Sequence, residues 1–234
     1  MNTKTYLGLF ATALALAGCG NASDTPGIED AEQPPVAAEI HPLLADVATA
    51  NYSLEKSHAF LTVKVPHNFG IAPYRISLVD IDGDLTFDPA DPEASSISFA
   101  INPAAVEANY PGDYKQTHAD SPWENWNEDI SRDQKWLNAD QHPEISFVST
   151  SATRTGELTG TVTGDLTLLG MTKPITLDVT YNGVANPPWF GERDVIGFDA
   201  TTTLLRSDFG MTAYAPLVGD ELTVEFSGEF LQDE

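Results

Sequence analysis

Hydrophobic and polar residues alternate with a period of two over much of this chain. The clearest run is residues 158–168, where apolar or small residues hold the even positions and threonine or aspartate the odd ones. Such alternation is typical of strands with one buried face. It recurs in residues 52–65, 74–87, 97–101, 145–147, 175–181, 196–204 and 222–226. About eight strands at these spacings predict an all-β fold, either a sandwich or a closed antiparallel barrel.

Two local features modify this pattern. The apolar parity switches between Leu78 and Val79, which predicts a bulge or bend within residues 74–87. Gly160 and Gly164 stand at inward positions of their strand. Small residues there suit tight curvature, or a lumen that leaves room for a ligand.

Residues 103–143 break the strand rhythm and hold three of the four tryptophans. The Ser-Pro-Trp-Glu run at 121–124 resembles a capping box with proline at the first helical position, so it predicts a helix start. Trp123, Trp126 and Ile130 would then share one helical face. That face either packs on the end of the barrel or forms a lid over its mouth.

The N-terminus has the profile of an export signal. Residues 6–16 form an uncharged apolar run behind Lys4, too short to cross a hydrocarbon core of ~30 Å. The following Leu-Ala-Gly-Cys run, at 16–19, resembles the bacterial lipobox. We therefore expect residues 1–18 to be a lipoprotein signal peptide and Cys19 to be lipidated. The alternative is an ordinary signal peptide with an incidental cysteine.

Cys19 is the only cysteine of the chain, so an intramolecular disulfide is excluded. Residues 19–50 are rich in proline, alanine and carboxylates, and contain no lysine or arginine. This composition predicts a solvated tether. Residues 51–234 are enough for one hydrophobic core, and we expect one barrel domain there.

Charge and motifs exclude several classes of function. With a net charge of −24 and only 11 lysines and arginines, the chain is not expected to bind nucleic acid. It lacks a Gly-x-Ser-x-Gly elbow, a His-Glu-x-x-His helix, a cysteine pair and a phosphate-binding loop, so we expect no catalytic residues and no cofactor.

We expect no metal site either. The three aspartates within residues 80–84 hint at calcium but lack a full ligand set. His58 and His67, nine residues apart, would lie on opposite faces of a straight strand. Arg206, Ser207 and Asp208 are candidates for a buried ion pair that closes a loop.

Several motifs, in register from Tyr52 to Phe230, resemble the YceI-like family. His-Pro-Glu-Ile-Ser-Phe-Val-Ser-Thr at 142–150 is similar to the family's Tyr-Pro-x-Ile-x-Phe-x-Ser-Thr strand. The most specific matches are residues 164–167, 170–177 and 198–210, the last ending Leu-Arg-Ser-Asp-Phe-Gly. About twenty residues around 110–129 look inserted relative to the family. The resemblance implies a closed antiparallel lipocalin-like barrel of about eight strands, with one or two short helices.

The resemblance also implies a function. YceI-like proteins bind polyisoprenoid or other long amphiphilic lipids, so we expect a membrane-anchored lipoprotein that carries or sequesters such a lipid in its lumen. A slender apolar chain would gain ~25 cal/mol per Å² of buried apolar area. The alternative is a surface structural or interaction lipoprotein whose barrel is fully packed. The two differ in whether a cavity exists.

The candidate ligand-binding residues are the inward apolar positions and one histidine near the expected barrel mouth. They are Phe99, Ile101, Phe147, Val162, Leu166, Leu177, Val179, Phe198, Leu204, Val224, Phe226 and His67. The expected location is the cell envelope, with the protein lipid-anchored in the outer membrane and facing the periplasm. The sequence leaves open the identity of the lipid, a homodimer, and the choice between inner and outer membrane.

Overall fold

The computed structural model describes residues 42–234. The predicted signal peptide, the predicted lipidation site at Cys19 and residues 19–41 of the predicted tether lie outside the described residues. Within 42–234, no helix is long and apolar enough to cross a membrane.

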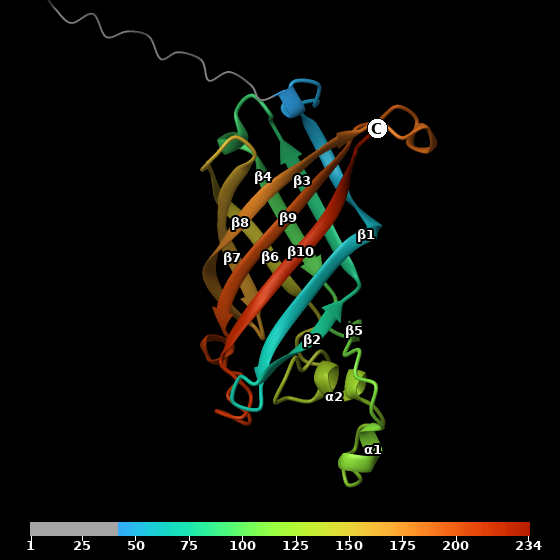
Figure 1. Cartoon of the computed structure of the whole chain (residues 1–234), viewed down its shortest axis with the longest axis vertical. Coiled ribbons are helices and arrows are strands. Elements are labelled where there is room, and N and C mark those ends of the chain that lie inside the picture. The colour runs from blue at the N-terminus through green and yellow to red at the C-terminus, as the bar shows by residue number, and fades with distance from the viewer. Residues whose placement is uncertain (1–41) are drawn as a thin grey trace, which may run out of the picture. The chain divides into compact units, whose positions relative to one another are not determined.

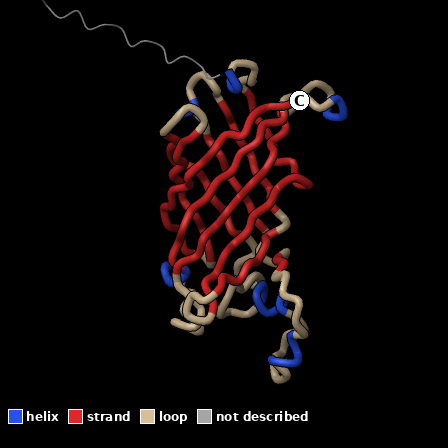
Figure 2. Tube along the Cα trace, viewed as in Figure 1, coloured by secondary structure: helices blue, strands red, loops and turns tan. Residues whose placement is uncertain are grey.

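Ten antiparallel strands form a single sheet that closes into a barrel (Figures 1 and 2). They are β1 (Ala50–His67), β2 (Ala72–Leu78), β3 (Ile81–Phe87), β4 (Ser96–Ile101), β5 (Val106–Glu107), β6 (Ile145–Arg154), β7 (Thr159–Leu168), β8 (Met171–Ala185), β9 (Val195–Leu205) and β10 (Glu221–Gln232). The helices are α1 (Tyr114–Thr117) and α2 (Trp126–Arg132), with 3-10 turns η1 (Pro42–Leu44), η2 (Pro92–Ala94), η3 (Pro188–Phe190) and η4 (Arg206–Phe209).

The predicted closed barrel is confirmed. The order β10-β9-β8-β7-β6-β4-β3-β1 returns to its start because β1 pairs with β10. β3 pairs with the first residues of β1 and β2 with its last, so β2 and β3 share one of eight positions around the barrel. The predicted bend in residues 74–87 is the break between these two strands, at Val79 and Asp80.

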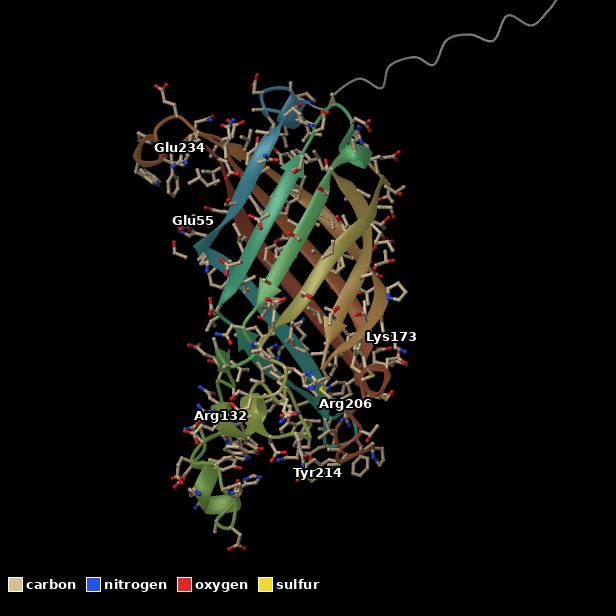
Figure 3. The ribbon with its side chains drawn as sticks, turned by 180° about the vertical axis from the view of Figure 1, so that it is seen from behind. Glu55, Arg132, Lys173, Arg206, Tyr214 and Glu234 are labelled. Atoms are coloured by element: carbon tan, nitrogen blue, oxygen red, sulfur yellow. The ribbon has the colours of Figure 1, made fainter. Side chains whose placement is uncertain are left out.

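Alternation along each strand separates an apolar inner face from a threonine-rich outer face. On the outside, threonine hydroxyls pair across strands: Thr163 with Thr176 at 3.0 Å and Thr167 with Thr172 at 2.8 Å. Cross-strand pairs of β-branched residues stabilise a sheet. β1 bends sharply near Glu55, where the register advances five residues on β1 against two on β10 (Figure 3).

The two ends of the barrel differ. One carries α1, α2 and the loops 68–71 and 210–220, and is called the α2 end; the other carries η1, η3 and the C-terminus, and is called the η1 end (Figure 1). α1 and α2 are the only α-helices of residues 42–234. The inserted segment therefore builds one end of the barrel rather than a second domain.

The predicted helix start at 121–124 is wrong. α2 begins at Trp126, because the Asn125 side chain accepts a hydrogen bond from the Glu128 backbone N–H and caps the helix. The Ser121 hydroxyl instead bonds the Tyr114 hydroxyl at 2.6 Å and accepts a hydrogen bond from the Trp123 N–H. The side chain that was expected to cap the helix therefore makes other contacts.

The predicted tether ends earlier than expected. Residues 42–50 belong to the folded domain, since Leu44 and Val47 are buried in the barrel core and Ala50 already pairs with Phe87. These two apolar side chains outweigh the polar composition that marked the segment as solvated.

Candidate functional site

A cavity of about 680 Å³ extends inside the barrel from Leu44 and Phe87 at the η1 end to His67 and Trp126 at the α2 end. Its volume lies within the ~300–1,000 Å³ usual for small-molecule sites. Most of its lining side chains are aliphatic or aromatic. The barrel is therefore not fully packed. The alternative function, a structural or interaction lipoprotein, assumed a fully packed barrel.

All twelve predicted candidates lie on the cavity wall: Phe99, Ile101, Phe147, Val162, Leu166, Leu177, Val179, Phe198, Leu204, Val224, Phe226 and His67. Seven strands contribute these residues, because period-two alternation turns every second side chain inward. Their contact with a ligand stays a prediction.

The inward side chains of β8 show that the interior is open. Ile175, Leu177 and Val179 point inward but are only half-buried, while Thr176 and Asp178 between them are exposed. On β3, by contrast, every inward residue from Ile81 to Phe87 is fully buried. The space therefore lies beside the β8 wall, whose inward side chains stay partly accessible.

Of the two roles expected for Gly160 and Gly164, room for a ligand is wrong, whereas the close approach of neighbouring strands fits tight curvature. A Cβ on Gly164 would lie 2.5 Å from the Phe147 ring and 2.5 Å from the Val148 carbonyl oxygen, and one on Gly160 would lie 2.9 Å from a backbone oxygen. Gly164 pairs with Ser149 beside a β6 bulge, which brings the two backbones together. The glycine accommodates a phenylalanine ring rather than a ligand.

A hydrogen-bonded segment closes the η1 end. Asp194 accepts from the Ala48 N–H at 2.9 Å and from the Asn186 side chain at 2.7 Å, and the Tyr52 hydroxyl donates to the Ala48 carbonyl. The Tyr181 hydroxyl donates to the Leu43 carbonyl at 3.1 Å. Burial, with Asp194 nearby, raises the pKa of the Tyr181 hydroxyl to about 12.

The inserted segment closes the α2 end. Trp126, Ile130, Trp136 and Leu137 line the cavity there, so α2 packs its apolar face over the barrel mouth. Trp123 lies away from that face, and its indole donates to Asp133 at 3.0 Å. Of the three residues expected to share one helical face, Trp126 and Ile130 do so and Trp123 does not.

Beneath α2 lies a buried polar network. Asp129 accepts from the Tyr114 hydroxyl at 3.0 Å and from the Lys135 ammonium at 2.7 Å. Burial alone would lower the pKa of Lys135, but its hydrogen bonds to Asp129 and Asp133 outweigh this and raise it. The network joins α1, α2 and the following turn to one another.

Two donors at this end lack partners. The Tyr74 hydroxyl and the Trp126 indole N–H are buried and make no hydrogen bond with any described residue. Their rings are 6.2 Å apart, and both residues line the cavity. An unpaired buried donor costs ~1–3 kcal/mol, and burial raises the pKa of Tyr74 to about 12.

The two histidines lie on opposite sides of the barrel wall, as the sequence predicts. His67 lines the cavity, whereas His58 is exposed and bonds Glu55. Of the aspartates that hinted at calcium, Asp82 is 2.6 Å from the Lys56 ammonium. Residues 42–234 contain no cluster of three potential metal ligands.

The predicted ion pair at Arg206 is wrong. The guanidinium is 2% exposed and donates to four backbone carbonyls, of Met211, Ala213, Val218 and Gly219, at 2.8–2.9 Å. Ser207 bonds Asp220, and Asp208 is exposed. Backbone carbonyls satisfy the buried charge because the 210–220 loop folds around it, although desolvation still lowers the pKa of Arg206.

Sequence reasoning missed several lining residues, among them Leu44, Tyr74, Trp136 and Tyr181. Tyr74 and Tyr181 stand at the ends of alternating runs, so parity could have found them. Leu44 and Trp136 lie outside any strand, and no local pattern marks them.

Comparison with known proteins gives a family and a fold. The YceI-like domain profile matches residues 52–230. A UPF0312 protein of Pseudomonas putida (strain W619) is 40% identical over 169 residues, covering 69% of this chain and 77% of the relative. A UPF0312 protein of Pseudomonas syringae pv. tomato is 37% identical over 182 residues, covering 76% of this chain and 86% of the relative.

Solved structures share the barrel. BcnA of Burkholderia cenocepacia superposes with a TM-score of 0.62 at 19% identity, covering 75% of this chain and 98% of that chain. A polyisoprenoid-binding domain of Saccharophagus degradans gives a TM-score of 0.55 at 12% identity, covering 78% and 98%. At these identities the likeness shows the fold alone.

Proposed function

Since the chain belongs to the YceI-like family, a family of binding domains, we propose that it binds a long-chain amphiphilic lipid, polyisoprenoid or quinone-like, in the barrel cavity. The observation that carries this proposal is the continuous apolar cavity of about 680 Å³. Carriage or sequestration follows, because the barrel would remove the lipid's apolar chain from water. The Saccharophagus degradans neighbour, described as a polyisoprenoid-binding domain, supports the choice of ligand class.

The charges around the cavity favour a lipid with an uncharged head. Only two lining residues carry a permanent positive charge, Arg154 and Arg206, and both donate to backbone carbonyls. A phosphate needs free cationic or N–H donors to offset its desolvation. A hydroxyl or carbonyl head needs only a donor, and the unpaired Tyr74 hydroxyl and Trp126 indole are candidates at the α2 end.

The experiment fills the lumen from one small residue. Ala200 lines the cavity on β9, and Thr203 on the same strand faces out and is exposed. Ala200→Trp should weaken binding of a fluorescent polyprenyl alcohol at least about ten-fold, which corresponds to ~1.4 kcal/mol. Thr203→Trp, the matched control, should bind as the parent does. A polyprenyl phosphate carrying the same fluorophore should bind more weakly than the alcohol.

Equal binding by both variants would place the probe outside the lumen. A parent chain that binds neither probe would contradict the lipid-binding function and favour the structural lipoprotein. Circular dichroism of both variants separates lost binding from lost folding.

The proposal includes a membrane anchor at Cys19 and a place in the cell envelope, on the outer membrane and facing the periplasm. The lipobox-like run at 16–19 and the lack of a second cysteine support it. Two or more acyl chains anchor a protein stably where one does not. Labelling with radioactive palmitate should mark the parent chain and not Cys19→Ser; a labelled variant would contradict the anchor.

A further inference from the structure

Exposed apolar side chains gather at the α2 end of the barrel. Among residues 42–234, twelve large hydrophobic residues are exposed, and seven of them belong to this end: Phe69, Ile71, Tyr110, Met171, Leu205, Tyr214 and Leu217. Only Leu43 and Trp189 belong to the η1 end. This asymmetry is unusual for a surface facing water on all sides.

Four of these residues form one continuous patch on two neighbouring loops. The Phe69 N–H donates to the Leu217 carbonyl at 3.3 Å, and His67 forms an isolated antiparallel β-bridge with Val218. Loops 68–71 and 210–220 therefore lie side by side. Phe69, Ile71, Tyr214 and Leu217 are 73%, 85%, 58% and 38% exposed, and are called the apolar rim below. Figure 3 shows Tyr214 at this end, close to Arg206.

The backbone is strained where it presents two rim aromatics. Phe69 has φ of 59° and Tyr214 has φ of 57°, in the left-handed region that bulky residues avoid. There the Cβ of an L-residue comes too close to the following carbonyl oxygen, which destabilises the backbone. Strained residues held in place by their surroundings often mark functional surfaces. Here the fold keeps two large apolar side chains exposed to water on strained backbone. Loops with ordinary φ angles would avoid this strain.

The rim borders the cavity. Asn68 and Val218, which flank Phe69 and Leu217 in sequence, both line it. Tyr214 stacks on Trp136, with ring centroids 5.8 Å apart, and Trp136 lines the cavity as well. An apolar surface therefore continues from the outside of the α2 end into the lumen.

We propose that the apolar rim docks into the surface of a lipid bilayer, so that a lipid passes between bilayer and cavity without crossing water. This inference rests on the proposed function. Exposed aromatic and aliphatic residues insert into the interfacial zone of a bilayer, and the gain scales with their buried apolar area. Neither loop contains lysine or arginine, so the contact is apolar and does not depend on anionic lipids.

Chain length allows the rim to reach the membrane that holds the anchor. Residues 20–41 separate Cys19 from the described domain, and 22 residues span at most about 75 Å. β1, with 18 residues, spans at most about 60 Å from the η1 end to the α2 end. An acylated Cys19 thus leaves the α2 end free to face the same bilayer.

The test compares the two ends of one protein. The full chain, purified from its host's membranes, carries an environment-sensitive NBD probe on either Ile71→Cys at the rim or Trp189→Cys at the η1 end. Both parent residues are highly exposed. The parent chain is labelled in parallel as a control, because any dye that it takes up must be attached to Cys19. In phosphatidylcholine vesicles, the probe at 71 should shift to the blue and be quenched by lipids with doxyl groups in their acyl chains. The probe at 189 should stay in water.

Equal quenching at both positions, or at neither, overturns the docking surface. A blue shift at 71 that needs no vesicles and grows with protein concentration also overturns it, because a second copy would then cover the rim.

A second measurement separates docking from ligand binding. The double variant Phe69→Ser and Ile71→Ser should slow transfer of the polyprenyl alcohol from vesicles about ten-fold, while its affinity for probe delivered from cyclodextrin equals that of Trp189→Ser. Equal transfer rates contradict the inference. If no variant or parent binds the probe from either source, the proposed function fails, and the quenching result still decides whether the rim enters a bilayer.

Discussion

At the scale of single residues, glycines let phenylalanine rings lie flat against the barrel wall. A Cβ on Gly164 would meet the Phe147 ring, and one on Gly83 would lie 2.9 Å from the Phe99 ring. A Cβ on Gly228 would lie 2.5 Å from the Phe226 ring. Each ring occupies the place of the missing side chain, and Phe99 on β4 also meets Phe226 on the non-adjacent strand β10, with ring centroids 5.1 Å apart. The wall is thus lined with aromatics and still encloses a cavity.

Gly164→Ala should therefore destabilise the barrel and also narrow it. The new Cβ would overlap the Phe147 ring and the Val148 carbonyl oxygen, and overpacking of this kind costs ~1–3 kcal/mol. Gly197→Ala is the matched control, since its Cβ would make an ordinary 3.5 Å contact. Thermal denaturation should show Tm lowered by several degrees for the first variant alone. An unchanged Tm for Gly164→Ala would contradict the ring-on-glycine arrangement.

At the scale of elements, short segments outside the strands close both ends of the barrel. η1 places Leu44 on the core beside Phe87 and Tyr181, and α2 covers the opposite mouth with Trp126 and Ile130. Neither segment pairs with any described strand. The Tyr181 hydroxyl donates to Leu43 in η1, and the Asn127 side chain of α2 accepts from the Ala108 N–H. The ends of the cavity therefore depend on non-strand residues.

Leu44→Ala tests the closure by η1. Leu44 is 4% exposed, and truncating a buried leucine to alanine costs ~2–5 kcal/mol. Leu43→Ala should cost much less, because that side chain is exposed and the Tyr181 hydroxyl bonds only its backbone carbonyl. Urea denaturation measures both free energies of unfolding. Equal losses in the two variants would mean that η1 does not pack on the core as described.

At the scale of the whole molecule, a chain with net charge −24 buries several tyrosine hydroxyls. Burial raises the pKa of Tyr74 and of Tyr181 to about 12, and raises that of Tyr52 as well. Above pH ~10, the ordinary pKa of tyrosine, these groups lose their protons in the unfolded chain and keep them in the folded one. Stability must then fall as pH rises.

We expect the free energy of unfolding to be steady between about pH 7 and pH 10 and to fall between about pH 10 and about pH 12. Tyr181→Phe should make the fall shallower, because it removes one group that titrates late. Trp189→Phe, at an exposed position and without a titrating group, should leave the slope unchanged. Urea denaturation across this pH range gives the free energy of unfolding, and tyrosinate absorbance gives the ionisation of the tyrosines. Identical slopes for the two variants would contradict the assigned role of Tyr181.

The sequence by itself determined the inner face of the barrel. Alternation is a local property of extended backbone, so residue parity assigned the eleven apolar candidates to the inner face, and all eleven line the cavity. The family motifs likewise predicted the closed barrel, because they lie within strands and their turns. Both predictions depend on neighbours in sequence.

Only the tertiary structure decided whether that wall encloses space and how its ends close. The β6 bulge and the Phe147 ring, not Gly164 alone, determine the room beside β7. Asn125 caps α2, so the helix starts at Trp126 while the Ser121 hydroxyl bonds Tyr114, and the 210–220 loop supplies the carbonyls that surround Arg206. Each outcome depends on the folded positions of side chains and loops outside the regular strands, which no local period encodes.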